Sequence, residues 1–259
     1  MTTQIDHANL LRSLHIKGDP LILFNIWDAG SARAIEHVGA KVLATGSWSV
    51  AASHGFNDGE KLPFDLVLAN LSRIIKSVNL PVTVDIEGGY GKSPRQLQTN
   101  VKKIIEAGAV GINFEDRIIG GKKLHSIEDQ CARIKAIHAI AKETAVPFFI
   151  NARTDIFFRN NDSDHNDFLI EEAIKRATAY ARSGADCFFV PGLKNPKYIE
   201  KLCQLSPIPI NILILSYPTS PKPFANLGVS RISYGPSPYC QVIDELKKAG
   251  RRAFSDYFY

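Results

Sequence analysis

The sequence predicts one (β/α)8 (TIM) barrel domain spanning residues 1–259, and three observations support this fold class. The length of 259 residues is close to the roughly 250 residues typical of such barrels. Short apolar runs recur at fairly even intervals, and segments with helical periodicity follow most of them. No Pro/Gly/Ser-rich linker or low-complexity tract divides the chain, so we expect a single domain.

The apolar runs are expected to be the barrel strands. They lack strict polar alternation, which is typical of parallel strands buried on both faces. They comprise residues 21–25, 41–45, 81–85, 110–114, 147–151, 186–190, 210–215 and 231–234. Eight runs of this kind favour a closed barrel over an open sheet.

The intervening segments are expected to be surface helices, because their apolar residues lie three or four apart with charged residues between them. They comprise residues 66–78, 94–107, 128–141, 171–183 and 196–205. Gly-Ala pairs at 39–40, 108–109 and 184–185 follow helical segments, where glycine can end a helix in a left-handed conformation. Two long polar connections, 58–64 and 157–168, are expected to be lids or walls of an active site.

Composition excludes several classes of protein. The formal charge of +5 is modest, and the basic residues occur in scattered pairs without interleaved aromatics, which disfavours nucleic-acid binding. The four cysteines are dispersed, so we expect reduced thiols rather than a zinc cluster. No apolar stretch approaches ~18 residues, and the first residues do not resemble a signal peptide. We therefore expect a cytoplasmic protein without membrane contact.

Polar residues at the carboxyl ends of the strands are the candidates for chemistry, because barrel enzymes place their active sites there. These residues are Asp28, Thr45, Gly46, Ser47, Asp85, Glu87, Glu115, Asp116, Arg153 and Asp155. Carboxylates that converge around one mouth repel one another unless a cation compensates. We predict a divalent-metal site on Asp85, Glu87 and Glu115. Ligation by oxygen alone favours Mg²⁺, or Mn²⁺, over zinc.

Each residue also has a simpler interpretation. An acidic residue just after a strand can cap the next helix, and Arg153 could neutralise Asp155 or Glu115 instead of holding a substrate carboxylate in a bidentate pair. Ser47 could be an ordinary turn residue. The residues taken together are more informative than any one of them. Their shared feature is the same relative position in three consecutive βα units, and they are Asp85, Glu87, Glu115 and Arg153. We therefore favour a shared site.

Four spaced motifs resemble the isocitrate lyase/phosphoenolpyruvate mutase superfamily. They are TGSWSVAASHGFND (45–58), VTVDIEGGYG (82–91), GINFEDRIIGGKKLHS (111–126) and FINARTD (149–155), and they span most of the barrel in the family's order. The resemblance implies that Asp85 contacts Mg²⁺ most directly, while Asp58, Glu87 and Glu115 hold its waters. It also implies that a 2-oxo or 2-hydroxy carboxylate is bound by Arg153 and by the turn Thr45, Gly46 and Ser47. Arg153 and Asp58 are then the catalytic candidates.

The sequence departs from the family's lyases at two places. Where lyases that act on methylisocitrate-like acids carry Lys-Arg-Cys-Gly-His, this chain has Lys122-Lys123-Leu124-His125-Ser126. A leucine cannot transfer the proton that the thiol handles, so methylisocitrate cleavage is disfavoured. Asn211, a candidate substrate-binding residue, is followed by Ile212 and Leu213, so a large tricarboxylate would lack partners. The chain instead resembles a phosphonomutase or carboxyphosphonoenolpyruvate mutase-like member without the lyase cysteine, but its loop GGKKLHS also lacks the Asn-rich pattern of the phosphonate-handling enzymes.

These observations leave three hypotheses. The first is a Mg²⁺-dependent carbon–carbon lyase that cleaves or decarboxylates a small 2-oxo or 2-hydroxy (di)carboxylic acid, such as an oxaloacetate-like acid, through a metal-stabilised enolate. The second is phosphorus–carbon chemistry of the phosphoenolpyruvate mutase or phosphonopyruvate hydrolase type. The third is a metal-dependent keto-acid binding protein without turnover. All three predict a small anionic carboxylate as the ligand.

The tail 241–259 is predicted to be a helix that docks on a neighbouring subunit. Val242, Leu246 and Phe254 can form an apolar stripe, and Tyr257, Phe258 and Tyr259 place three aromatic side chains among the final residues. A monomer would expose them to water unless the tail packed on its own barrel, and the residues alone leave both arrangements open. The family resemblance implies an exchanged helix and a homotetramer built as a dimer of dimers.

Overall fold

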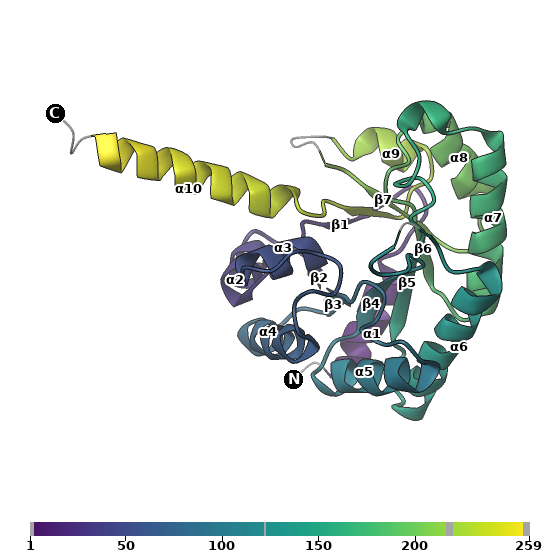
Figure 1. Cartoon of the computed structure of the whole chain (residues 1–259), viewed down its shortest axis with the longest axis horizontal. Coiled ribbons are helices and arrows are strands. Elements are labelled where there is room, and N and C mark those ends of the chain that lie inside the picture. The colour runs from purple at the N-terminus through teal and green to yellow at the C-terminus, as the bar shows by residue number, and fades with distance from the viewer. Residues whose placement is uncertain (1–2, 122, 216–219, 256–259) are drawn as a thin grey trace.

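The chain folds into a ring of eight parallel strands with helices outside it, which confirms the predicted (β/α)8 barrel (Figure 1). The structure is a computed structural model that describes residues 3–121, 123–215 and 220–255. Strand β1 pairs with β8, and the pairing continues in order from β8 down to β2. A parallel bridge between Ile26 and Thr45 joins the two remaining edges, so the barrel is nearly closed.

The strands lie where the apolar runs predicted them, although most are shorter than expected. Their bounds are β1 Leu21–Leu23, β2 Leu43–Ala44, β3 Val82–Asp85, β4 Gly111–Glu115, β5 Phe149–Arg153, β6 Cys187–Phe189, β7 Ile210–Leu213 and β8 Arg231–Ser233. Strand β2 is shortest because the chain turns immediately after it, and a helix begins at Ser47.

The predicted surface helices are confirmed, and several shorter helices accompany them. Their bounds are α1 Gln4–Ser13, α2 Ala29–His37, α3 Ser47–Ser53, α4 Phe64–Ser77, α5 Pro94–Glu106, α6 Ile127–Glu143, α7 Asp167–Arg182, α8 Pro196–Leu205, α9 Lys222–Asn226 and α10 Ser237–Ser255, with a 3-10 turn η1 at Asp162–Asp164. Asp28 begins α2 by accepting a hydrogen bond from the backbone N–H of Ser31 at 2.7 Å. Asp28 is therefore a helix cap.

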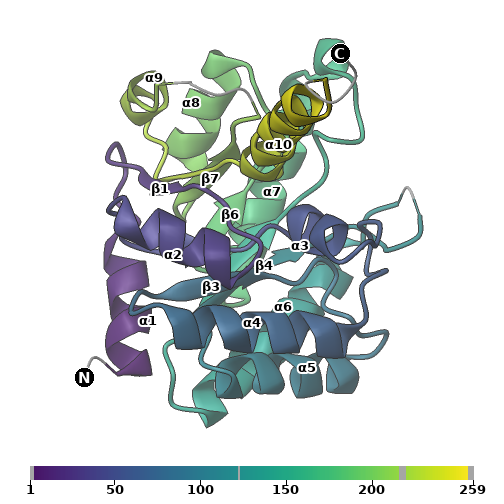
Figure 2. The ribbon, with the colours of Figure 1, turned by 90° about the vertical axis from the view of Figure 1, so that its left-hand side faces the viewer.

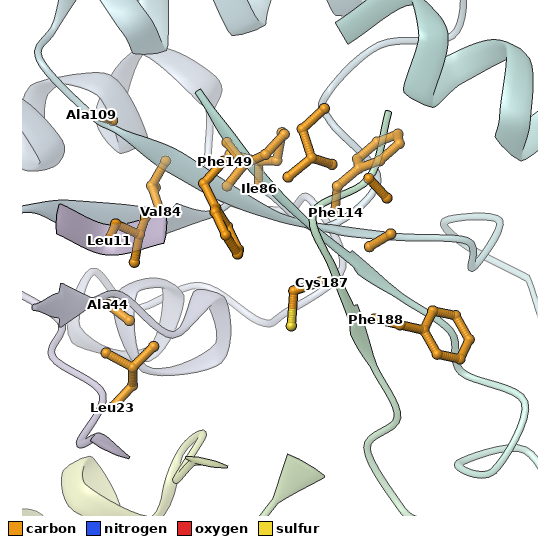
Figure 3. Close-up of a cluster of buried hydrophobic side chains, with 14 of the residues drawn as sticks. Leu11, Leu23, Ala44, Val84, Ile86, Ala109, Phe114, Phe149, Cys187 and Phe188 are labelled. Atoms are coloured by element: carbon orange, nitrogen blue, oxygen red, sulfur yellow. The ribbon is translucent and has the colours of Figure 1, made fainter. Parts of the chain in front are cut away.

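The core fills the barrel and the space beneath the helices. Helix α4 buries Val67, Leu71 and Ile74, which lie on one face at helical spacing. All five residues of β4 are buried, as expected for a parallel strand covered on both sides. Figure 3 shows side chains from several strands, including Val84 and Phe149, gathered in this core.

Three glycines end helices as predicted. Gly39, Gly108 and Gly184 have φ angles of 95°, 105° and 106°, in the left-handed region that glycine adopts without a steric penalty. A Cβ atom at Gly184 would also lie 2.7 Å from the ring of His138. The repeated Gly-Ala pairs therefore mark where each helix stops and the chain turns toward the next strand.

Helix α10 extends away from the barrel instead of packing on it (Figures 1 and 2). Its buried residues, Ser237 and Pro238, lie at its first turn. Leu246 and Phe254 are 66% and 69% exposed. The predicted tail helix is thus confirmed, but Tyr257, Phe258 and Tyr259 lie outside the described residues, as does Lys122.

The position of α10 leaves part of the barrel wall uncovered. Ile22, the middle residue of β1, is 37% exposed although its neighbours Leu21 and Leu23 are buried. A groove of about 480 Å³ lies there, lined partly by Ile16, Phe24, Ile35 and Val38. This wall thus has the apolar surface that a covering helix would bury.

Across the described ranges 3–121, 123–215 and 220–255, no helix combines the length and hydrophobicity needed to cross a membrane.

Candidate active site

A cavity of about 210 Å³ lies at the carboxyl ends of the barrel strands. Its polar lining includes residues that the sequence singled out, namely Thr45, Gly46, Ser47, Asp58, Asp85 and Arg153. Its remaining lining includes a largely apolar wall formed by Trp48, Phe158, Phe189, Pro191, Leu213 and Leu215. The lining therefore combines charged side chains, here called the charged end of the cavity, with an apolar wall, here called its apolar end, and such a lining suits a small amphipathic anion.

Asp85 ends β3 and lies at the centre of the charged end. Its Oδ1 accepts hydrogen bonds from Asn113 Nδ2 and from the backbone N–H of Glu87, both at 3.1 Å. Its Oδ2 accepts a longer bond of 3.3 Å from the backbone N–H of Ser47. The Thr45 hydroxyl in turn accepts from the backbone N–H of Asp85 at 3.0 Å. The turn 45–47 and Asp85 thus form one hydrogen-bonded unit.

Glu87 holds the loop that carries Asp58. Its Oε2 accepts hydrogen bonds from the backbone N–H groups of Gly59 and Glu60 at 2.7 and 2.8 Å. Its Oε1 accepts from the Tyr90 hydroxyl at 3.2 Å. Glu87 has a φ of 50°, a left-handed conformation that is rare for a residue with a side chain. Strain of this kind is commonest at functional sites.

The carboxylates at this end of the cavity disfavour one another's ionisation. Burial, together with Asp58 and Asp85, raises the pKa of Glu87 to about 8. Burial and the Asp85 carboxylate raise the pKa of Asp58. Removal from water penalises a charge, and like charges nearby add to that penalty. A bound cation would relieve both effects.

Glu115 and Arg153 face each other on neighbouring strands. They are register partners of β4 and β5, and Arg153 Nη1 lies 3.1 Å from Glu115 Oε2. Burial raises the pKa of Glu115 to about 8, although Arg153 acts in the opposite direction. Arg153 also donates to Asp155, from Nε at 2.6 Å and from Nη2 at 3.1 Å. The neutralising contacts considered for Arg153 are therefore present, and a substrate would share or replace them.

Two further polar residues, Asn211 on β7 and Arg231 on β8, are buried near the cavity. Asn211 is fully buried, exchanges hydrogen bonds with Ser233, and is absent from the cavity lining. Arg231, the first residue of β8, does line the cavity and was not anticipated from the sequence. A single charged residue at the start of an apolar run was the available signal, but the run alone does not reveal which way its side chain points.

Comparison with known proteins identifies the relationship. Residues 11–254 match the phosphoenolpyruvate phosphomutase family. The chain belongs to this family. A crystal structure from Burkholderia cenocepacia, provisionally described as a phosphonomutase, is 42% identical, with 96% of this chain and 99% of that chain covered and a TM-score of 0.94.

Two other proteins are similar to this chain, the first in sequence and the second in fold. The 2-methylisocitrate lyase of Escherichia coli is 28% identical over 81% of this chain and 70% of its own length. A phosphonopyruvate hydrolase solved with oxalate and Mg²⁺ shares the fold, with a TM-score of 0.84, 22% identity, and coverage of 98% of this chain and 88% of that chain.

The oxygen donors here suit a magnesium ion that keeps most of its water. Within the part of the chain that the structure describes, no three Asp, Glu, His or Cys side chains are already placed to hold an ion together. Mg²⁺ commonly binds through one or two carboxylates and retains several waters. Asp85 could contact the ion directly, with Asp58, Glu87 and Glu115 contacting its waters. The raised pKa values of Asp58 and Glu87, to which the Asp85 carboxylate contributes in both cases, fit this arrangement.

The loop that carries the cysteine in the family's lyases is a short hairpin here. Arg117 and Leu124 form an antiparallel bridge, and the backbone N–H of Ile118 donates to Lys123 at 2.9 Å. Leu124 packs against the hydrophobic core. At this position the chain therefore has a packing side chain and no proton donor.

Proposed function

We propose that the protein is a Mg²⁺-dependent enzyme that cleaves or decarboxylates a small 2-oxo or 2-hydroxy (di)carboxylic acid. The observation that carries this proposal is the convergence of three carboxylates: Asp58 and Asp85 line the cavity, and burial together with these two carboxylates raises the pKa of Glu87. In the hydrolase of the same fold, the charged ligands are oxalate and Mg²⁺. Membership of a family of lyases and mutases supports an enzyme rather than a passive binding protein.

Mg²⁺ would supply positive charge beside the enolate-like oxyanion that develops in the reaction. The chain's own groups would orient the acid. The Arg153 guanidinium would bind a carboxylate through its planar donors, and the turn 45–47 would set the distance between substrate and Asp85. Fixed donors of this kind stabilise charge in the transition state because they need no reorganisation during the reaction.

The apolar end of the cavity limits the size and charge of the substrate. Pro191, Leu213 and Leu215 offer no hydrogen-bond donor to a third carboxylate. Leu124 likewise offers no proton to a departing carbon acid. Decarboxylation is the reaction least affected, since the final protonation can come from water. We therefore favour oxaloacetate-like acids as substrates.

A second candidate is phosphorus–carbon chemistry on a phosphonate such as phosphonopyruvate. The provisional phosphonomutase at 42% identity favours it. Purified protein and Mg²⁺ should be incubated with a panel of keto, hydroxy and phosphono acids while pyruvate, CO₂ and phosphate are followed by NMR. Release of CO₂ or a cleaved carbon acid supports the first proposal, and phosphate or rearranged phosphonate supports the second. Saturable binding without turnover across the panel would contradict both and leave a binding protein.

Arg153→Lys should raise the substrate's dissociation constant roughly tenfold. An ammonium cannot reproduce the planar two-point contact of a guanidinium, and a hydrogen bond to a charged group contributes about 1.5 kcal/mol or more. Calorimetric titration of the Mg²⁺-loaded protein with oxalate measures this. Arg12→Lys, at the exposed ion pair with Asp186, is the matched control and should bind as the unmodified chain does. Equal affinity in both variants would remove Arg153 from the binding site.

Leu124→Cys should not create measurable methylisocitrate cleavage. The substitution restores a thiol, but Pro191, Ile212 and Leu213 still lack polar groups for the additional carboxylates of that substrate. Production of pyruvate and succinate from methylisocitrate, followed by NMR, tests this expectation. Rapid cleavage by this variant would show that the apolar wall does not restrict the substrate.

We also propose that the protein assembles as a homotetramer, a dimer of dimers whose subunits exchange helix α10. The support is complementary apolar surface. Val242, Leu246 and Phe254 are exposed on α10, and the groove beside Ile22 is open on the barrel wall. A second copy's helix is the natural occupant of that groove, because it carries the same apolar residues that the first copy leaves exposed.

We also propose that the protein is cytoplasmic, since Cys131, Cys187, Cys203 and Cys240 are free thiols.

A further inference from the structure

The buried arginine on β8 has no role in the site as described so far. Arg231 is 3% exposed and pairs in register with Leu21 of β1 and Asn211 of β7. Ile22 points outward from β1, so its neighbour Leu21 points inward, and Arg231 opposite Leu21 shares that inward face. Its side chain also lines the cavity that contains Asp85 and Arg153. Arg231 is thus a cation inside the barrel, at the wall of the site.

Arg231 differs from the other buried and half-buried arginines in having no hydrogen-bond partner for its side chain among the described residues. Its Nε and Nη1 atoms are buried without a partner. Arg176 lies against Asp116, Glu172 and Tyr180, and Arg133 donates to Gln130 and to a backbone carbonyl. Arg153 is bonded to two carboxylates. Arg231 is therefore the one of these four arginines with side-chain donors left unpaired. Because Nε and Nη1 are enclosed, a ligand would reach the guanidinium from the side that lines the cavity.

Among the residues that the structure describes, no anionic group offsets the charge of Arg231 once a cation occupies the site. Burial lowers the pKa of Arg231 to about 10, which still leaves it protonated at neutral pH. Burial raises the pKa of Cys187 to about 12, so this neighbouring thiol is neutral. Asp85 also acts on Arg231, but the proposed Mg²⁺ would take up that carboxylate's charge. An uncompensated buried cation is costly, and a barrel core normally holds apolar side chains at such positions.

We propose that Arg231 binds a second anionic group of the substrate. This deepens and rests on the proposed function, because it specifies a dianionic acid: one carboxylate at Arg153 and Ser47, and a second carboxylate or phosphonyl group at Arg231. Two cations in the cavity match two negative groups. The arginine is retained despite its cost to folding because the ligand, and not the protein, supplies its counter-charge.

Pairs of ligands that differ by one anionic group test the assignment. Calorimetry on the Mg²⁺-loaded full chain compares malate with lactate for a second carboxylate, and 3-phosphonolactate with lactate for a phosphonyl group. We expect the unmodified chain to bind at least one dianion roughly tenfold or more tightly than lactate, the factor expected for about 1.4 kcal/mol. Arg231→Met should abolish that preference while leaving lactate binding little changed. Arg231→Lys, which retains the charge, should preserve part of it.

Thermal unfolding without ligand separates this role from a structural one. Arg231→Met should raise the melting temperature by roughly 2–4 °C, because it replaces a buried, unpartnered cation with an apolar chain of similar length. Arg176→Met is the matched control and should lower it, because it leaves the buried Asp116 without its cation. A lowered melting temperature for Arg231→Met, unchanged dianion preference in that variant, or no preference in the unmodified chain would each overturn the assignment. Absence of turnover with an intact dianion preference would contradict only the proposed function.

Discussion

Asp85→Ala is expected to abolish Mg²⁺ binding and turnover while leaving the barrel folded. Asp85 is the carboxylate proposed to contact the ion directly. Hydrogen bonds that it accepts from Ser47, Glu87 and Asn113 fix its orientation. Removing it takes away the ligand charge and the fixed oxygen positions that a hard cation needs. The lost side chain contributes little to the apolar core, so the melting temperature should change little. Calorimetric titration with Mg²⁺, together with circular dichroism, measures both effects.

Asp28→Ala is the matched control for this prediction. Asp28 also follows a barrel strand, but it caps helix α2. Its removal should cost about 1 kcal/mol of stability, as for other helix caps, and should leave Mg²⁺ affinity unchanged. Asp85→Ala should therefore lose Mg²⁺ binding and keep its stability, whereas Asp28→Ala should lose stability and keep Mg²⁺ binding. Wild-type Mg²⁺ affinity in Asp85→Ala would rule out the proposed ion site.

Removal of residues 241–259 is expected to yield aggregated or poorly soluble protein. The truncation deletes most of α10 but keeps Ser237 and Pro238, its buried residues. In the proposed assembly the groove beside Ile22 is covered by a second copy's helix, so every truncated copy would expose that groove to water. Exposed apolar surface of this kind promotes association without a defined geometry.

Size-exclusion chromatography with light scattering measures the outcome. The full chain should run as a tetramer, and Leu246→Glu should weaken the assembly, because it places a charge among the apolar residues of α10. Lys247→Glu, at the exposed neighbouring position, is the control and should remain assembled. A monodisperse monomer of the full chain, or a soluble and active truncation, would contradict the exchange of α10.

The fold was largely predictable because burial on both faces leaves a strong mark on a sequence. The apolar runs located every strand, and the Gly-Ala pairs located three helix ends with positive φ angles. Helix α3 was not predicted, since Ser47–Ser53 is too short to show helical periodicity and follows directly on β2. The position of α10 was also open, because an apolar stripe does not reveal which barrel it will cover.

The sequence predicts which candidate residues lie at the strand ends. It does not predict which way each of their side chains points. Glu115 and Asp116 are adjacent, yet Glu115 faces Arg153, whereas Asp116 pairs with Arg176 and Tyr180 behind the strand. Alternation along a strand produces this separation. Arg231 was missed for the same reason. Its chemistry depends on an inward orientation that only the register with β1 reveals.

Glu87 accepts hydrogen bonds from the backbone of Gly59 and Glu60 and so holds the loop 58–64 in place. In the proposed site, ligand affinity would therefore depend on how well this loop is ordered. The loop is also attached through Glu60, whose Oε1 accepts from the backbone N–H of Tyr90 at 2.8 Å. Ordering a loop has an entropic cost, and whatever meets that cost in advance tightens binding. We therefore expect Glu60 to contribute to ion and substrate affinity in the proposed site without touching either ligand. Variation along 58–64 can tune how strongly the protein holds its ligands while the barrel itself stays unchanged.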